Sequence, residues 1–157
     1  MPSPKAANKT AAKAKAQNSL LLGNQLCFAL YSTSLAMTRL YKPLLAPLKL
    51  TYPQYVVMMA LWEQDDVSVS ALGERVFLDS GTLTPLLKRL EATQLLVRQR
   101  QTHDERAVHI SLTPAGKALQ VQAAGIPVCI GQSMQYDWTD VQKLTLQLQA
   151  LRSNLSV

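Results

Sequence analysis

The stretch 78–91, LDSGTLTPLLKRLE, decides the fold of this chain. A polar turn at 78–81 leads into a helical pattern that runs from Thr82 to Glu91, and another short helical pattern, Ala71–Val76, precedes the turn. Two brief helices joined by a tight turn are typical of a helix-turn-helix. We therefore take this segment as the centre of the fold.

A β-hairpin is predicted directly after this segment. Leu95–Arg100 and Ala107–Leu112 are strand-like runs, and the polar stretch QTHDER at 101–106 lies between them as a charged tip. A hairpin after a helix-turn-helix is a wing. The pattern thus predicts a winged helix-turn-helix over residues 51–113, with its wing at 95–112.

Long helical patterns flank this module. Apolar residues recur at helical spacing from Asn18 to about Lys42, where Pro43 and Pro47 are predicted to end the helix. Thr51 and Gln54 then form a capping-box signal for a helix that reaches about Glu63, with Pro53 in its first turn.

The C-terminal part is also predicted to be helical. Thr113 and Pro114 mark the start of one helix, and Thr139 with Gln142 marks the start of a last helix that reaches about Leu151. Between them, helix-breaking residues are predicted to interrupt the helix around Cys129; they are Gly125, Pro127 and Gly131.

The fold class predicted is mainly α with a small β-hairpin wing, in a single domain over 18–157. Residues 18–48 and 114–157 carry apolar stripes that so small a module cannot bury by itself, so we assign them as dimerisation helices and expect an intertwined homodimer. Residues 1–17 read as a basic, disordered leader.

Charge alone is weak evidence for a partner. The formal net charge is +6, but several lysines lie in the leader, where a basic tail often serves only solubility. No apolar stretch reaches the roughly 20 residues of a membrane helix, and no signal peptide is visible. We expect a cytoplasmic protein with no membrane partner.

The two cysteines, Cys27 and Cys129, lack metal-ligand spacing, so we expect free thiols and neither metal nor cofactor.

The segment 78–91, the DER tip at 104–106 and LTPAG at 112–116 together resemble the MarR family of transcription regulators. More narrowly, LCFALYS at 26–32, with Tyr41, Tyr52 and PQY at 53–55, resembles its organic-hydroperoxide-sensing branch, OhrR. The similarity covers about 20–116. It implies a repressor rather than an enzyme, which binds a double-stranded DNA operator and releases it when an organic hydroperoxide oxidises Cys27.

A recognition helix needs small hydrogen-bonding residues in its first turn and cations further along. Ser80, Thr82 and Thr84 meet the first condition, and Lys88 and Arg89 meet the second. Gly81 lets the backbone approach DNA closely, and the positive end of the helix dipole favours a phosphate there. The alternative is that these residues merely cap a core helix and form a solvated face.

The wing offers a second contact with DNA. Arg106 could enter the minor groove with Asp104 orienting its guanidinium, as the matching arginine does in the family, or the two could form a plain surface ion pair. Arg98 and Arg100 are either contacts to the DNA backbone or solvated strand residues.

The predicted redox sensor is Cys27, because Tyr31 lies one helical turn away and can donate a hydrogen bond to its sulfur. Tyr41 lies about 21 Å further along a continuous helix, so a contact with Cys27 would require a second subunit. The resemblance implies that Tyr41 and Tyr52 reach the sulfur across the dimer. Cys129 is either a resolving thiol or a buried structural cysteine.

Three other functions stay open at this point. A repressor of the same family could be released by a small aromatic ligand bound between its dimerisation and DNA-reading parts. A thiol peroxidase would use the same cysteine but would leave the helix-turn-helix unexplained. A winged-helix interaction module would bind no DNA, and a salt-dependent gel shift would separate it from a regulator.

Overall fold

The computed structural model describes residues 18–100 and 108–155, with the backbone alone described for Arg100. The chain divides into two compact units, Met1–Leu40 and Tyr41–Val157. The predicted leader, 1–17, and the wing-tip residues Asp104 and Arg106 lie outside the described residues. Helix α2 (Leu26–Leu45) contributes to both units.

In the first unit, the helix predicted from Asn18 is wrong at its start. A short 3-10 helix, η1 (Leu22–Asn24), comes first, and Gln25 then has an extended backbone with φ −93° and ψ 115° before α2 begins. The Asn24 side chain donates to the backbone carbonyl of Asn18 at 2.8 Å. Asparagine side chains that bond to nearby backbone in this way compete with the helix.

In the second unit, α2 continues to Leu45, past the end predicted at Lys42, and Pro43 lies inside its last turns. A proline there removes one N–H from the helix ladder, close to the helix end. The 3-10 helix η2 (Ala46–Leu48) follows and ends at Lys49, whose φ is 55°.

Helix α3 (Tyr52–Glu63) confirms the predicted capping signal, because the Thr51 N–H and hydroxyl both donate to Gln54 Oε1, at 2.8 and 3.0 Å. The helix supplies the centre of the core. Its buried apolar side chains are Tyr55, Val57, Met58, Ala60 and Leu61.

Helices α4 (Val69–Val76) and α5 (Ser80–Ala92) form the predicted helix-turn-helix, but each begins two residues earlier than predicted, because Ser68 and Asp79 cap them. The turn is tight. Phe77 is left-handed at φ 55°, and a Cβ on Gly73 would lie 2.9 Å from the Leu78 carbonyl oxygen. A side chain at position 73 would therefore push the two helices apart.

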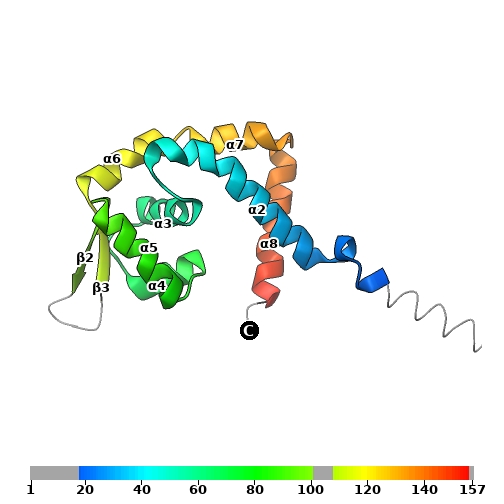
Figure 1. The fold of residues 1–157 in the computed structure, drawn as a ribbon, viewed down its shortest axis with the longest axis horizontal. Coiled ribbons are helices and arrows are strands. Elements are labelled where there is room, and N and C mark those ends of the chain that lie inside the picture. The colour runs from blue at the N-terminus through cyan, green and yellow to red at the C-terminus, as the bar shows by residue number, and fades with distance from the viewer. Residues whose placement is uncertain (1–17, 101–107, 156–157) are drawn as a thin grey trace, which may run out of the picture. The chain divides into compact units, whose positions relative to one another are not determined.

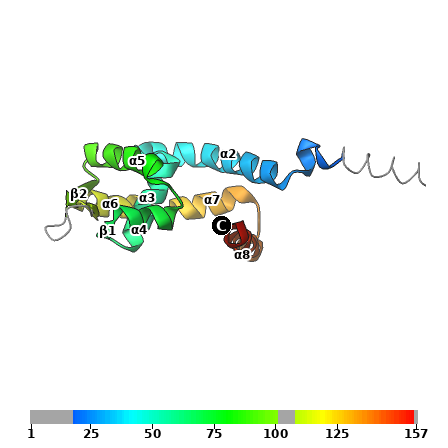
Figure 2. The same cartoon turned by 90° about the horizontal axis from the view of Figure 1, so that it is seen from below.

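The predicted wing is confirmed in its strands. β1 (Val67–Ser68), β2 (Leu96–Arg100) and β3 (Val108–Leu112) form an antiparallel sheet in the order β1-β3-β2. In Figure 1, the strands β2 and β3 stand at one edge of this unit, beside α5, and α6 leaves from the end of β3; Figure 2 labels β2 at the same edge. The buried side of the sheet carries Leu96, Ile110 and Leu112.

Helix α6 (Pro114–Ala123) begins as predicted, because Thr113 Oγ1 accepts from the Gly116 N–H at 3.0 Å. Gly116 also accepts the indole N–H of Trp62 at 2.9 Å. A Cβ at this glycine would lie 2.0 Å from the carbonyl oxygen of Leu95. Only glycine allows α6 to pack this closely on the strand.

The prediction that the helix breaks around Cys129 is wrong. The interruption lies at Gly125, and Cys129 is inside α7 (Ile126–Met134), with Pro127 in the first turn. A proline at the second helical position needs no hydrogen bond, so it starts this helix instead of ending one. The Cys129 N–H donates to the Gly125 carbonyl at 3.2 Å.

Helix α8 (Trp138–Leu155) begins one residue before Thr139, so the predicted Thr139 cap is wrong; the Asp137 carbonyl accepts from the N–H groups of Asp140 and Val141. The helix has no buried residue. Within the described residues, none of the helices combines the length and apolar character needed to cross a membrane.

Candidate nucleic-acid interface and thiol site

The first turn of α5 is organised by Asp79. Its Oδ1 accepts from the backbone N–H of Thr82 at 2.9 Å, and its Oδ2 accepts from the Thr82 hydroxyl at 2.8 Å. The Thr82 N–H and then the Thr82 hydroxyl lower the pKa of Asp79, so it is a carboxylate at neutral pH. A negative side chain thus already lies at the helix end where a phosphate was predicted, so it competes with a phosphate for the positive end of the helix dipole. The phosphate contact itself stays a prediction.

The predicted reading residues of α5 divide between two sides of the helix. Leu83, Leu87 and Leu90 are buried and fix the inner side. At about 100° per residue, Gly81, Lys88 and Arg89 point away from this core, with Thr82 on the flank. All four are exposed.

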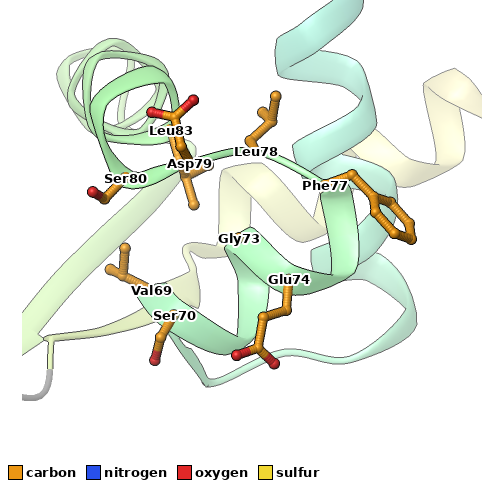
Figure 3. Close-up of a pocket in the computed structure, with 9 residues that line it drawn as sticks. All are labelled: Val69, Ser70, Gly73, Glu74, Phe77, Leu78, Asp79, Ser80 and Leu83. Atoms are coloured by element: carbon orange, nitrogen blue, oxygen red, sulfur yellow. The ribbon is translucent and has the colours of Figure 1, made fainter. Parts of the chain in front are cut away.

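Ser80 and Thr84 lie nearer to neighbouring elements. Ser80 is exposed at the rim of a groove of about 470 Å³ between α4 and α5. Figure 3 shows it across from Val69 and Ser70, at the same end of α5 as Asp79. Thr84 is half-buried and lines a second cavity, of about 340 Å³, together with Ser68, Ser70 and Arg98.

The same groove exposes an aromatic side chain. Phe77, 61% exposed, points outward from the turn between the two helices (Figure 3), and the guanidinium of Arg152 lies 4.0 Å from its ring centroid. The contact joins α8 to the helix-turn-helix, as a cation–π interaction.

Arg98 has a structural partner that the sequence did not predict. Its backbone N–H donates to Glu91 Oε1 at 3.2 Å, and its Nε and Nη2 donate to Glu91 Oε2 at 2.8 and 2.5 Å. Arg98 lowers the pKa of Glu91 by these hydrogen bonds. The pair fixes β2 to the end of α5. This pair accounts for Arg98 without a contact to DNA. The sequence signal that could have indicated it was a glutamate at the end of a helix, followed by an arginine in the next strand.

A second junction holds β3. Asp65 Oδ1 accepts from the Leu112 N–H at 2.8 Å, and Asp65 Oδ2 lies 3.0 Å from Lys117 Nζ. Asp66, left-handed at φ 56°, accepts from Ser111 at 3.1 Å. Both aspartates lie just after the end of α3. Here they connect that end to the wing.

A tyrosine cluster lies where α2 meets α3. The Tyr41 ring centroid is 4.7 Å from that of Tyr52 and 5.9 Å from that of Tyr55. Burial, with the neighbouring Tyr52 and Tyr55, raises the pKa of Tyr41 to about 12. Tyr41 thus keeps its proton at any physiological pH, so its hydroxyl can donate a hydrogen bond.

Both cysteines are exposed free thiols. Cys27 lies near the start of α2 in the first unit, where Tyr31 is 61% exposed, and Cys129 lies on α7 in the second unit. Within one chain, Cys129 is therefore not a buried cysteine. α2 runs without interruption from Cys27 to Tyr41. On a continuous helix these two residues are too far apart to touch, so a contact between them requires a second subunit.

The helix-turn-helix, the wing and the basic outer side of α5 define a winged-helix DNA-binding regulator. The family of transcriptional regulators described as SarA/Rot matches residues 39–121. An organic hydroperoxide resistance transcriptional regulator of Bacillus subtilis is 46% identical over 134 residues, which are 85% of this chain and 91% of the relative.

Two solved structures of AbfR, a Staphylococcus epidermidis protein, are also similar. Reduced AbfR bound to DNA has a TM-score of 0.77 at 32% identity, over 89% of this chain and 96% of AbfR. Disulfide-formed AbfR has a TM-score of 0.62 at 33% identity, over 88% and 98%. The chain therefore belongs to the MarR family of DNA-binding transcriptional regulators, in its OhrR branch.

Proposed function

We propose that this regulator is a homodimeric repressor that senses organic hydroperoxides through Cys27 and then releases its operator. The observation that carries the proposal is the exposure of Cys27 as a free thiol near the start of α2. The solved structures of AbfR, reduced on DNA in one case and disulfide-formed in another, support it by similarity.

A second subunit explains the exposed apolar side chains. Leu26 and Leu30 on α2 are 58% and 36% exposed, and Leu144 and Leu155 on α8 are 48% and 67% exposed. Two chains that cover these helices with each other remove that surface from water. The proposed dimerisation segments are 18–48 and 114–157, around a DNA-reading module at 51–113.

The tyrosines support the sulfur chemistry. In the dimer, Tyr31 of the same subunit and Tyr41 and Tyr52 of the second subunit donate hydrogen bonds to the Cys27 sulfur. Because Tyr41 holds its proton up to a pKa of about 12, it stabilises a thiolate without acting as a base. Replacing Tyr41 or Tyr52 by Phe slows oxidation, and the effect shrinks as the pH rises.

The reaction proceeds in two steps. The Cys27 thiolate attacks one peroxide oxygen, so that an S–O bond forms, the O–O bond breaks, and the alkoxide leaves as an alcohol after taking a proton. The Cys129 thiol then attacks the sulfenic sulfur, forming a disulfide and releasing water. The hydroperoxide is the oxidant in the first step, and the sulfenic acid is reduced by the thiol in the second.

The proposed DNA contacts lie on α5 and at the tip of the wing. Thr82 and Gly81, with Ser80 and Thr84 at their flank, face bases in the major groove, while Lys88 and Arg89 contact phosphates. Arg106, oriented by Asp104, enters the minor groove from the wing tip.

The test is fluorescence anisotropy on operator DNA, taken from the gene's own upstream region, during titration with cumene hydroperoxide. The parent protein releases DNA and recovers with reductant. Cys27→Ser binds DNA as the parent does and keeps it, because serine preserves shape but forms no sulfenic acid. Cys129→Ser still reacts, but recovers less with reductant because no internal thiol traps the sulfenic acid.

The alternative is a repressor released by a small aromatic ligand. If Cys27→Ser releases DNA with peroxide as the parent does, Cys27 is not the sensor, and Cys129 becomes the first candidate. If neither cysteine variant changes the response, the ligand-controlled repressor replaces this proposal.

A further inference from the structure

The hydrogen bond between Asp79 and Thr82 limits what Thr82 can recognise. A threonine hydroxyl has one O–H donor and two acceptor lone pairs. The donor is already used, because the hydroxyl donates to Asp79 Oδ2 at 2.8 Å. Both residues are exposed at the first turn of α5, so the lone pairs remain available to an outside partner.

Two features keep this orientation fixed. Asp79 is anchored by its other oxygen, which caps the Thr82 N–H at 2.9 Å, so the carboxylate is held by two bonds to the same residue. The Thr82 N–H and hydroxyl also lower the pKa of Asp79, and a charged acceptor strengthens the bond from the hydroxyl. The O–H therefore stays directed at Asp79 across the neutral pH range.

We infer that Asp79 is a positioning residue for specificity, which makes Thr82 a pure hydrogen-bond acceptor that selects a base with an exocyclic amino group. In the major groove, adenine N6 and cytosine N4 are the donors, whereas guanine and thymine present acceptors. The inference rests on the proposed contact of α5 with the major groove. It predicts one position in each operator half-site where adenine or cytosine is preferred.

Asp79 variants separate this role from helix capping. Asp79→Ser keeps a good cap for the Thr82 N–H but has no second oxygen for the hydroxyl, so Thr82 becomes both donor and acceptor. Asp79→Asn keeps its carbonyl on the N–H and places its amide NH₂ against the Thr82 oxygen. The Thr82 O–H is then free to point outward, and its preference reverses to guanine or thymine.

The experiment is selection of full-length, reduced protein on randomised DNA duplexes, followed by affinity measurements on duplexes that differ at the selected position. The parent prefers adenine or cytosine there by about fivefold to tenfold. Thr82→Val and Asp79→Ser lose this preference, Thr82→Ser keeps it, and Asp79→Asn prefers guanine or thymine. Thermal unfolding of each variant identifies any loss of fold, and Asp79→Ser supplies a second readout if Asp79→Asn fails to fold.

The inference is overturned if Thr82→Val selects the same bases as the parent, or if Asp79→Asn keeps the parent's preference. A preference for thymine that survives in Thr82→Val also overturns the inference, because a side-chain methyl group at position 82 would then recognise the base in place of the hydroxyl. If the parent retains no duplex at all, the proposed DNA contact of α5 fails and this inference fails with it; if it retains DNA with unchanged preference in every variant, only the inference fails.

Discussion

The winged-helix module and the helices that flank it differ in how they bury their apolar side chains. Within the module, Leu72, Leu83 and Leu90 are 0% exposed. Helix α8 has no buried residue, and Leu26 near the start of α2 is 58% exposed. One chain thus completes a hydrophobic core that includes side chains of α6 and α7, but it leaves the start of α2 and the whole of α8 uncovered. Stability of the folded core and assembly of the proposed dimer are therefore separable by mutation.

The largest effect is expected on the apolar stripe of α8. Leu144, Leu148 and Leu155 recur at helical spacing on one side of the helix. Leu144→Glu should raise the dimer dissociation constant roughly a hundredfold or more, because a charge would be buried without a partner. Sedimentation at micromolar concentration measures the change.

The matched control is Leu146→Glu, on the opposite side of the same helix, at 65% exposed. It should leave the dimer intact. A parent protein that sediments as a monomer, or an equal effect of the two substitutions, would show that this stripe is not the interface.

The packing of α6 against the module should be most sensitive at Gly116. Gly116→Ala places a Cβ 2.0 Å from the Leu95 carbonyl oxygen, so α6 must move off the strand. We expect the free energy of unfolding to fall by about 2–3 kcal/mol, a typical cost of overpacking. Urea unfolding measures the loss, and Gly131→Ala, where a Cβ meets nothing within 4 Å, is the control. A stability equal to that of the parent would contradict the close packing described.

The DNA contacts should be separable by their salt dependence. Arg106→Ala should cost about 1–3 kcal/mol of operator affinity and relax specificity, as loss of a groove contact does. Lys88→Ala should weaken binding to all sequences alike and lower the salt slope by about 1. Binding titrations at several salt concentrations measure both. Parent-like binding by Arg106→Ala would remove the wing from the interface.

The smallest effect concerns the Glu91–Arg98 pair inside the module. Because Arg98 lowers the pKa of Glu91 below 4.5, the charged pair stabilises the fold above that pH, and the stabilisation is lost as the pH falls through the lower folded value. Glu91→Gln should thus cost about 1 kcal/mol or less at neutral pH and nothing at the acid end. Stability curves against pH, with the exposed Glu74→Gln as control, measure it. A constant difference at all pH values would mean that packing, not charge, holds the pair.

The sequence predicted most of the fold because local signals and tertiary packing agree in it. The capping box at Thr51 and the strands of the wing follow from residue type and alternation, and the structure has both. The start of α5 was missed, although Asp79 three residues before Thr82 is an N-cap signal. Ser80 and Gly81 suggested a turn by propensity, and the Asp79 carboxylate overrides that preference.

The candidate site was predicted only in part. The exposure of Cys27 and Cys129 and the approach of Tyr41 to Tyr52 required coordinates. The predicted helix break around Cys129 was wrong. A proline or glycine can end a helix or start one, depending on its position in that helix, and the spacing of these residues in the sequence does not reveal that position. The Arg98 partner could not be predicted from composition, since it depends on how β2 returns along α5.

In the proposed mechanism, Cys27 is the first sulfur to be oxidised, and Cys129 traps its sulfenic acid. The most direct measurement is the intact and peptide mass of the protein after cumene hydroperoxide, with and without reductant, for the parent, Cys27→Ser and Cys129→Ser. We expect a reducible Cys27–Cys129 disulfide in the parent, oxygen added at Cys27 in Cys129→Ser, and no change in Cys27→Ser. Oxidation of Cys129 in the Cys27→Ser protein at the parent's rate would contradict it.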